Sequence, residues 1–210
     1  MKAVARSPLH TTRDERRTLL AEHFIGVVEG LVEGGEAFGD LPVERLLKAG
    51  GVSRSAFYNY FDDKGDLLRA MAGLVVGEIS AAGVHWWDLH PDATPADLRA
   101  ALQPAVDAYR RHRTILGAMF ETAVADPRVR EERDRLVEET VAGLAAHIAA
   151  RQADGRAAPD LHAERTARWF VWMLEQGQYA LGLSADDAEA DAMFDTAADI
   201  LWRTLYAGWR

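Results

Sequence analysis

Apolar residues recur every three or four positions along most of the chain, which is the period of an α-helix. No stretch shows the alternation of apolar and polar residues that a half-buried strand requires. In the first predicted helix, over 12–34, the pattern runs from Leu19 to Leu31 and ends at Gly34-Gly35. We therefore predict an all-α protein of about nine helices.

The other boundaries come from proline, glycine and capping residues. A short helix follows Pro42, and Gly50-Gly51 ends it. The stretch "DLHPDATP" over 88–95 is the clearest linker, and Pro104 is expected to bend the helix that follows it. Three further helices are predicted over 54–60, from 64 to about 87 and from 96 to about 112. Another follows the last of these and ends near residue 125, and the final three lie from 127 to about 153, over 162–181 and over 185–206.

The helix predicted over 54–60 is too short to be stable alone in water. Ser53 can cap it, because a serine hydroxyl accepts a hydrogen bond from a free amide of the first turn. Its apolar side can face the preceding short helix through one seam, made by Val43, Leu46 and Leu47 against Val52, Phe57 and Phe61. Two short helices joined by a glycine turn and packed on a longer helix form a helix-turn-helix unit.

Once the seam is formed, the 54–60 helix is left with a polar face of Arg54, Ser55, Tyr58 and Asn59. All four side chains carry hydrogen-bond donors, which suits base edges and phosphates in the major groove of DNA. Lys64 begins the next helix, and adds a cation and a positive helix end suited to a phosphate. This pattern favours a nucleic-acid partner, although a short aromatic helix can also be simple core with Tyr58 or Tyr60 half-buried.

The overall charge is −9 for 210 residues, which by itself argues against a polyanionic partner. Its distribution changes that picture, because residues 1–64 hold nine Lys/Arg against ten Asp/Glu and the remainder carries the other −8. The chain has no cysteine, so disulfides and thiolate metal sites are excluded. With no targeting segment and no membrane-length apolar run, we expect a protein of the cytoplasm that has no membrane partner.

The stretch "VERLLKAGGVSRSAFYNYFDDKGDLL" over 43–68 resembles the DNA-binding core of TetR-family transcriptional repressors. Two segments further along, "GRAAPDLHAE" over 155–164 and "ADILWRTLYAGWR" over 198–210, are similar to the mycobacterial ethionamide-repressor subgroup. The resemblance implies an N-terminal arm and helix-turn-helix domain over 1–63, and a helical effector-binding and dimerisation bundle over 64–210. It also implies a homodimer that represses by binding a palindromic double-stranded operator.

By its match to the family motif, the chain would bring Arg54, Ser55 and Asn59 to base edges, with Tyr58, Tyr60 and Lys64 on phosphates. Arg6 and Arg13 of the arm would add contacts. The sequence departs from the family at Ala56, where a threonine often contacts DNA, and at Leu47 and Gly50, which replace the usual alanines.

The resemblance also implies a small-molecule effector in the bundle, whose binding changes the separation of the two DNA-reading heads. Val171 and Leu174 stand where the subgroup has asparagines, so we expect a largely apolar effector. The last two helices, with Phe194, Ile200, Leu201 and Leu205, are expected to form the dimer interface. The residues expected near the effector are Tyr109, Met119, Phe120, Val141, Leu144, Trp172, Glu175, Tyr179 and Trp202.

Two other classes of function stay open at this point: a helical enzyme, and an adaptor that binds only protein. The sequence gives an enzyme little support, because no histidine follows a glutamate by three residues, as a di-iron bundle requires. The stretch "HWWDLH" over 85–90 is weak as a metal site and is more simply a tryptophan-anchored loop. We expect no catalytic residue, no metal and no cofactor.

Overall fold

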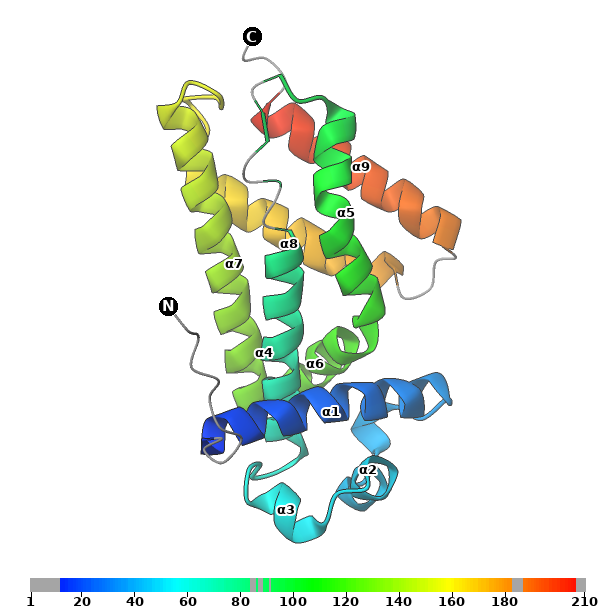
Figure 1. Ribbon diagram of the computed structural model, residues 1–210. Helices are drawn as coiled ribbons and strands as arrows, with labels where there is room; N and C mark the ends of the chain where they lie inside the picture. Colours follow the sequence, from blue (N-terminus) through cyan, green and yellow to red (C-terminus); the bar gives the residue numbers. More distant parts are fainter. Residues whose placement is uncertain (1–11, 84–85, 87–88, 91, 183–186, 207–210) are drawn as a thin grey trace, which may run out of the picture. The chain divides into compact units, whose positions relative to one another are not determined.

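A computed structural model describes residues 12–83, 86, 89–90, 92–182 and 187–206, with the side chains of 178–182 and 187 excepted. Every regular element in this part of the chain is helical, as predicted (Figure 1). None of its helices combines the length and apolar character needed to cross a bilayer. The elements are α1 (Arg13–Glu33), the 3₁₀ turn η1 (Phe38–Asp40), α2 (Val43–Gly50), α3 (Arg54–Tyr58), α4 (Lys64–Ala82), α5 (Pro95–Arg111), α6 (Arg113–Ala125), α7 (Pro127–Ala153), α8 (Ala163–Gly182) and α9 (Asp187–Leu205).

Most predicted helix bounds agree with these to within a few residues. The helix α3 ends at Tyr58, two residues before the predicted end, and the largest difference is at α4, which ends at Ala82 rather than near residue 87. Pro104 lies inside α5, which continues through it from Pro95 to Arg111. The helix begins with a capping box, in which Thr94 and Asp97 satisfy each other's backbone amides.

The chain divides into two compact units. The first contains residues 1–74 and 114–130, and the second contains 75–113 and 131–210. Each unit is therefore built from two separate stretches of chain, and α4 and α7 contribute residues to both. From the sequence we expect a different boundary, between residues 63 and 64, which separates a DNA-binding domain from an effector-binding and dimerisation domain. This functional boundary stays a prediction.

The first unit has an aromatic core that holds the short helix α3. Phe24, Phe57 and Phe61 are almost completely buried. The ring of Phe57 meets Phe24 edge-on at 6.0 Å between centroids and lies 5.4 Å from Phe61. Such pairs contribute beyond their buried area, and Leu46 of α2 is completely buried as well. A helix of five residues is thus anchored through Phe57, and Figure 1 shows α1 lying across α2 and α3.

The turn between α2 and α3 has the chemistry predicted for it. Gly51 ends α2 with φ of +63°, in the left-handed region that glycine adopts without a steric penalty. The amide of Val52 then donates to the carbonyl of Leu47 at 3.0 Å. The Ser53 hydroxyl accepts from the amide of Ala56 at 3.1 Å, so the predicted cap of α3 is confirmed.

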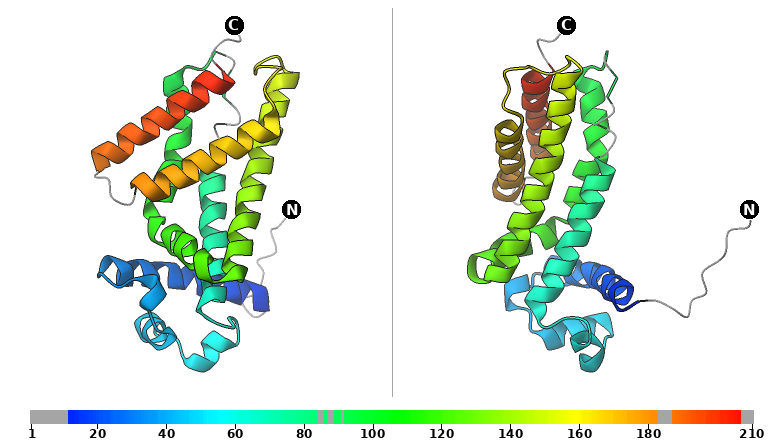
Figure 2. Two further views of the ribbon diagram at one scale, coloured as in Figure 1. Left: turned by 180° about the vertical axis from the view of Figure 1, so that it is seen from behind. Right: turned by 90° about the vertical axis from the view of Figure 1, so that its left-hand side faces the viewer.

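The second unit has an aliphatic and aromatic core of its own, to which α5, α7, α8 and α9 contribute. Figure 2 shows α8 and α9 running side by side in this unit, and both α8 and α5 pack against α9. Leu201 and Leu205 of α9 belong to this core, whereas Ile200 is 41% exposed. The buried members are Trp86, Leu98, Val137, Val141, Leu144, Ile148, Ala167, Phe170, Val171, Leu201 and Leu205.

Candidate functional site

The outer face of α3 carries the polar side chains that the sequence assigned to it. Arg54, Ser55, Tyr58 and Asn59 are all exposed, with Tyr58 at 42%, while Phe57 between them is buried. The structure therefore brings four of the six predicted DNA-binding residues together on one accessible surface. We call this set of four the α3 polar face.

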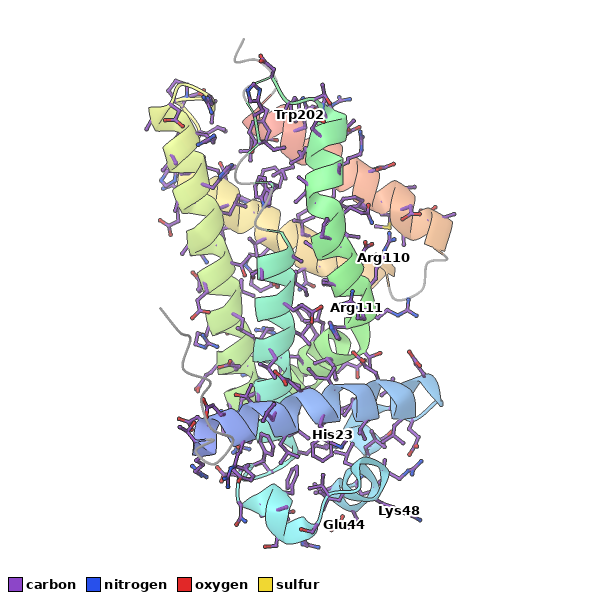
Figure 3. The ribbon with its side chains drawn as sticks, in the orientation of Figure 1. His23, Glu44, Lys48, Arg110, Arg111 and Trp202 are labelled. Carbon is purple, nitrogen blue, oxygen red and sulfur yellow. The ribbon has the colours of Figure 1, made fainter. Side chains whose placement is uncertain are left out.

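Arg54 already has two neighbours on this surface. Its guanidinium donates to the Glu44 carboxylate of α2 at 2.8 Å and lies 5.5 Å from the centre of the Tyr58 ring. Both members of the ion pair are about two-thirds exposed, so water and salt weaken it. Figure 3 marks Glu44 and Lys48 on α2, the helix that precedes α3. No spacing in the sequence had indicated that a carboxylate would pair with Arg54.

Tyr60 and Arg13, which the sequence also assigned to DNA contacts, lie at the end of α3. Tyr60 is half-buried in the turn after α3. Arg13, at the start of α1, donates to the backbone carbonyl of Asn59 at 3.0 Å, so it holds the end of α3 while the Asn59 side chain stays exposed. Arg6 lies outside the described residues.

The Lys64 side chain binds backbone carbonyls of its own chain, whereas a lysine that binds a DNA phosphate needs free N–H donors. Its ammonium donates to three backbone carbonyls, those of Phe38 at 2.9 Å, Gly39 at 2.7 Å and Leu41 at 2.9 Å. It also lies 5.0 Å from the centre of the Phe38 ring. Burial lowers the pKa of the Lys64 ammonium, against the opposing effect of Asp40. Because an ammonium has three N–H donors, all of them are engaged here. The phosphate contact of Lys64 stays a prediction.

The N-terminus of α4 is fixed by a carboxylate that the sequence pattern did not single out. Asp66 is buried, and its Oδ1 accepts from both Arg17 and Arg69 at 2.8 Å. Its Oδ2 accepts from the amide of Asp62 at 3.2 Å. The Arg17 guanidinium also covers the Phe61 ring at 4.9 Å. This cluster ties α1, the turn after α3 and the first turn of α4 together, which sets the position of α3.

Asp63 caps α4. Its Oδ1 accepts from the amide of Asp66 at 2.8 Å, and its Oδ2 accepts from Arg128 at 2.6 Å. Although burial raises the pKa of the Asp63 carboxyl, the bonds from Arg128 and from backbone amides outweigh this and lower it. Arg128 also donates to Asp126 at 3.3 Å, within the first unit.

The residues predicted to line an effector site fall into both units. Met119 and Phe120 belong to the first unit. Val141, Leu144, Trp172 and Trp202 belong to the core of the second unit, with Trp172 and Trp202 only partly buried. Figure 3 labels Trp202 on α9. The side chain of Tyr179 lies outside the described residues, and Tyr109 and Glu175 form a polar group in the second unit.

Glu175 is the acidic residue of this polar group. Burial raises the pKa of its carboxyl to about 7, although Arg133 acts in the opposite direction. Its Oε2 atom is inaccessible to solvent and has no hydrogen-bond partner among the described residues. Burial, and then the charge of Glu175, raise the pKa of the Tyr109 hydroxyl far above its usual value. A buried carboxylate oxygen that accepts no hydrogen bond costs free energy.

A second buried polar group in the same unit was not predicted. The Tyr206 hydroxyl lies 3.0 Å from Nε2 of His147, whose ring is 4.8 Å from that of Trp86. Burial raises the pKa of Tyr206 to about 12, against the effect of Arg151. In the sequence these residues are widely separated and single, so no spacing pattern could reveal the group. In the described part of the chain, no cluster of three or more His, Asp or Glu side chains is arranged to hold a metal ion.

The comparison with known protein families identifies the family of this chain. The family described as "Transcriptional regulator EthR, C-terminal domain" matches residues 98–207, which is more than half of the chain. The chain belongs to the EthR family of transcriptional regulators. A search of curated protein sequences gave no match.

Solved structures show which fold this EthR-family chain has. The regulatory protein TetR from Rhodobacter sphaeroides is 21% identical, with a TM-score of 0.65, and the match covers 86% of this chain and 98% of that one. The TetR-family regulator PfmR from Thermus thermophilus is 18% identical, with a TM-score of 0.62 and the same two coverages, 86% and 98%. The predicted fold, a helix-turn-helix unit followed by a helical bundle, is thereby confirmed, as is the resemblance to TetR-family regulators.

Proposed function

We propose that this EthR-family chain is a homodimeric repressor that binds a palindromic operator and is released from it by a small, largely apolar effector. The single observation that carries the DNA-binding part is the α3 polar face. A five-residue helix is held by a buried aromatic core while its donors point outward into solvent. A segment built only as core would bury such groups, whereas Arg54 keeps only an exposed pair with Glu44 and the other three side chains are exposed.

In this proposal α3 enters the major groove. Arg54, Ser55 and Asn59 approach base edges, while Tyr58 and Tyr60 hold phosphates. Lys64 acts on DNA chiefly by positioning, because its ammonium links η1 to the start of α4. A dimer would place two such helices in successive grooves about 34 Å apart, which requires an operator with two-fold symmetry.

The dimer interface is proposed on α8 and α9. Trp169 of α8 is 78% exposed, and Leu174 and Ile200 add apolar area on the same two helices. Exposed large apolar side chains favour an interaction surface on these two helices. Phe194, Leu201 and Leu205, which the sequence also suggested for this interface, are buried within the chain. Replacing Trp169 by serine should convert dimers to monomers in sedimentation velocity, and an unchanged sedimentation coefficient would refute this interface.

The effector is proposed to bind beside the core of the second unit. Support comes from the partly buried Trp172 and Trp202 at the edge of that core, and from the Glu175 oxygen that no described residue bonds. The proposal keeps the other residues that the family resemblance implied, which are Tyr109, Met119, Phe120, Val141, Leu144 and Tyr179. An effector lowers operator affinity only by binding the DNA-incompetent arrangement more tightly than the competent one. α4 is the natural link, since it begins beside the α3 turn and continues into the second unit.

Selection of bound fragments from genomic DNA, followed by titrations at several salt concentrations, tests DNA binding. Each phosphate contact adds about 0.9 to the slope of log affinity against log salt. Arg54→Ala should relax sequence preference at defined operator positions. Arg45→Ala is the matched control, because Arg45 also forms an exposed Arg–Glu pair, with Glu36, but lies outside α3. Absence of any enriched sequence, or equal loss in both variants, would refute the assignment.

Effector release has its own test. A panel of lipophilic compounds is scanned for thermal stabilisation of the protein, since a ligand that binds only the folded state raises Tm. Compounds that stabilise the protein should also release it from the selected operator. Compounds that stabilise it and leave operator binding intact would contradict a role as effectors. The matching family and the similar structures are regulators, so we propose no catalytic step.

A further inference from the structure

The carboxyl group of Glu175 is the most unusual polar group of the second unit. Its Oε2 atom is buried and accepts no hydrogen bond from any described residue, which is uncommon for a carboxylate oxygen in a folded protein. The Arg133 guanidinium acts on Glu175 through its charge. Arg133 donates instead to the Asp134 carboxylate through Nε at 2.9 Å and through a terminal nitrogen at 2.5 Å. No described residue therefore donates a hydrogen bond to Glu175 Oε2.

The surroundings of Glu175 are apolar on one side. Val171 and Trp172 precede it on α8 by four and three residues, which places them on the same face of the helix. Val171 is part of the core of the second unit, and Trp172 packs against that core while remaining partly accessible. A molecule that reached Glu175 along this face would meet aromatic and aliphatic surface first, and one acidic oxygen at its end.

We propose that the effector class of this protein is apolar amines, with the protonated nitrogen on Glu175 Oε2 and the apolar body against Val171 and Trp172. This inference rests on the proposed function, and it sharpens the largely apolar effector to a cationic one. A charged donor suits this position better than a neutral one, because hydrogen bonds between ionised partners are about twice as strong as neutral ones.

Alternative ligand headgroups fit the same oxygen less well. A carboxylic acid would place a second negative group beside Glu175, and like charges at short range disfavour each other. A hydroxyl could donate one hydrogen bond but would leave the buried charge uncompensated. The charged and titratable groups that act on this carboxyl are Arg133 and Tyr109, and the cation of Arg133 is already paired with Asp134. Among the described residues, no cation donates a hydrogen bond to Glu175 Oε2. The ammonium of a bound amine would supply one.

Three compounds of equal length, phenylbutylamine, phenylbutanol and phenylbutyrate, separate these possibilities. Binding to the full-length protein without DNA is measured by calorimetry at about pH 8, where most of the Glu175 carboxyl, with its pKa near 7, is ionised. The amine should bind about tenfold or more tightly than the alcohol, with the acid weakest. Glu175→Gln should bring the affinity of the amine down to that of the alcohol. Glu164→Gln, an exposed change on the same helix, should preserve the preference.

Equal affinities of amine and alcohol in the wild-type protein would overturn the inference. An amine preference that survives Glu175→Gln, or failure of all three compounds to bind, would do the same. The proposed function is judged separately, by operator binding and by release with the wider lipophilic panel. Release by neutral compounds with no preference for amines would therefore reject the amine class and leave the repressor proposal standing.

Discussion

Glu44 of α2 accepts a hydrogen bond from the Arg54 guanidinium of α3 at 2.8 Å. The pair bridges the two short helices of the helix-turn-helix unit, and the Tyr58 ring lies against the other side of the same guanidinium at 5.5 Å. In the free protein, therefore, the residue proposed to read a base edge is held by an internal carboxylate. Binding to DNA requires Arg54 to exchange Glu44 for a nucleic-acid acceptor.

Removal of this competing carboxylate should strengthen DNA binding. In Glu44→Gln, Arg54 is freed and a negative charge near the phosphates is lost. Because an exposed ion pair of this kind is weak, its removal should raise the affinity for DNA by up to about fivefold. Fluorescence anisotropy with the selected operator measures it. Glu36→Gln is the control, since it breaks the exposed pair with Arg45 away from α3 and should leave affinity unchanged. Weaker binding by Glu44→Gln would mean that the pair holds Arg54 in its DNA-reading position.

Replacement of Lys64 by methionine should destabilise the protein. The carbonyls of Phe38, Gly39 and Leu41 would lose their common donor. Phe38 keeps the bond from the amide of Leu41 and the Gly39 bond is exposed, so the cost of about 1 to 3 kcal/mol for an unsatisfied buried acceptor falls chiefly on the Leu41 carbonyl. Urea denaturation measures the change, and Lys48→Met, at an exposed position of α2, should have little effect on it.

The same Lys64→Met variant separates positioning from phosphate binding. If Lys64 acts by positioning, its DNA affinity should fall with an unchanged salt slope. An unchanged unfolding free energy together with a salt slope reduced by about 0.9 would instead support the direct phosphate contact.

Asp66→Asn should be one of the more damaging single changes in the first unit. The side chain keeps its size but loses the charge that Arg17 and Arg69 share at 2.8 Å. Loss of one partner from a mostly buried ionic cluster costs about 2 to 4 kcal/mol. Denaturant unfolding measures this, with the exposed Glu22→Gln on α1 as the control. Equal stability of the two variants would show that the Asp66 cluster does not fix α4 to α1.

Glu175→Gln should stabilise the protein in a pH-dependent way. Burial raises the pKa of Glu175 from its usual 4.5 to about 7, so the folded state binds this proton more tightly than the unfolded state. Wild-type stability should then fall as pH rises from about 4.5 through about 7, because the unfolded chain releases the proton first. The variant lacks this loss, and at about pH 8 it should be more stable by up to about 3 kcal/mol.

Urea unfolding at several pH values tests this prediction. Wild type and Glu175→Gln should converge near pH 4 and diverge above neutrality, while Glu164→Gln should follow the wild type throughout. A Gln variant less stable than the wild type at about pH 8 would show that the ionised carboxylate has a partner, against the basis of the amine proposal.

Local features of the helix-turn-helix unit could be read from the sequence. The cap at Ser53, the turn glycine at Gly51 and the buried position of Phe57 depend on residues only a few positions apart. Side chains in such a short segment have few alternative arrangements, so spacing alone assigned most of the α3 polar face. The partner of Arg54 could not be read in the same way, because it comes from a different helix.

The contacts that hold this surface in place were not predictable from spacing. Lys64 reaches carbonyls 23 to 26 residues earlier in the chain, and Arg17 reaches Asp66 across 49 residues. Before folding, Lys64 and Asp66 are simply charged residues near the start of a helix, for which an outside partner is the simplest expectation. That no described residue bonds Glu175 Oε2 is likewise a property of packing, since Arg133 bonds Asp134 instead.

By itself, the sequence determined that this protein is helical, where its short helix begins, and which side chains that helix turns outward. These depend on periodicity, caps and turns, whose energies are decided within a few residues. Only the tertiary structure decided which charges are satisfied internally and which remain available, because that depends on which distant groups share the same small volume away from water. The protein's remaining capacity to bind a partner is therefore set by packing.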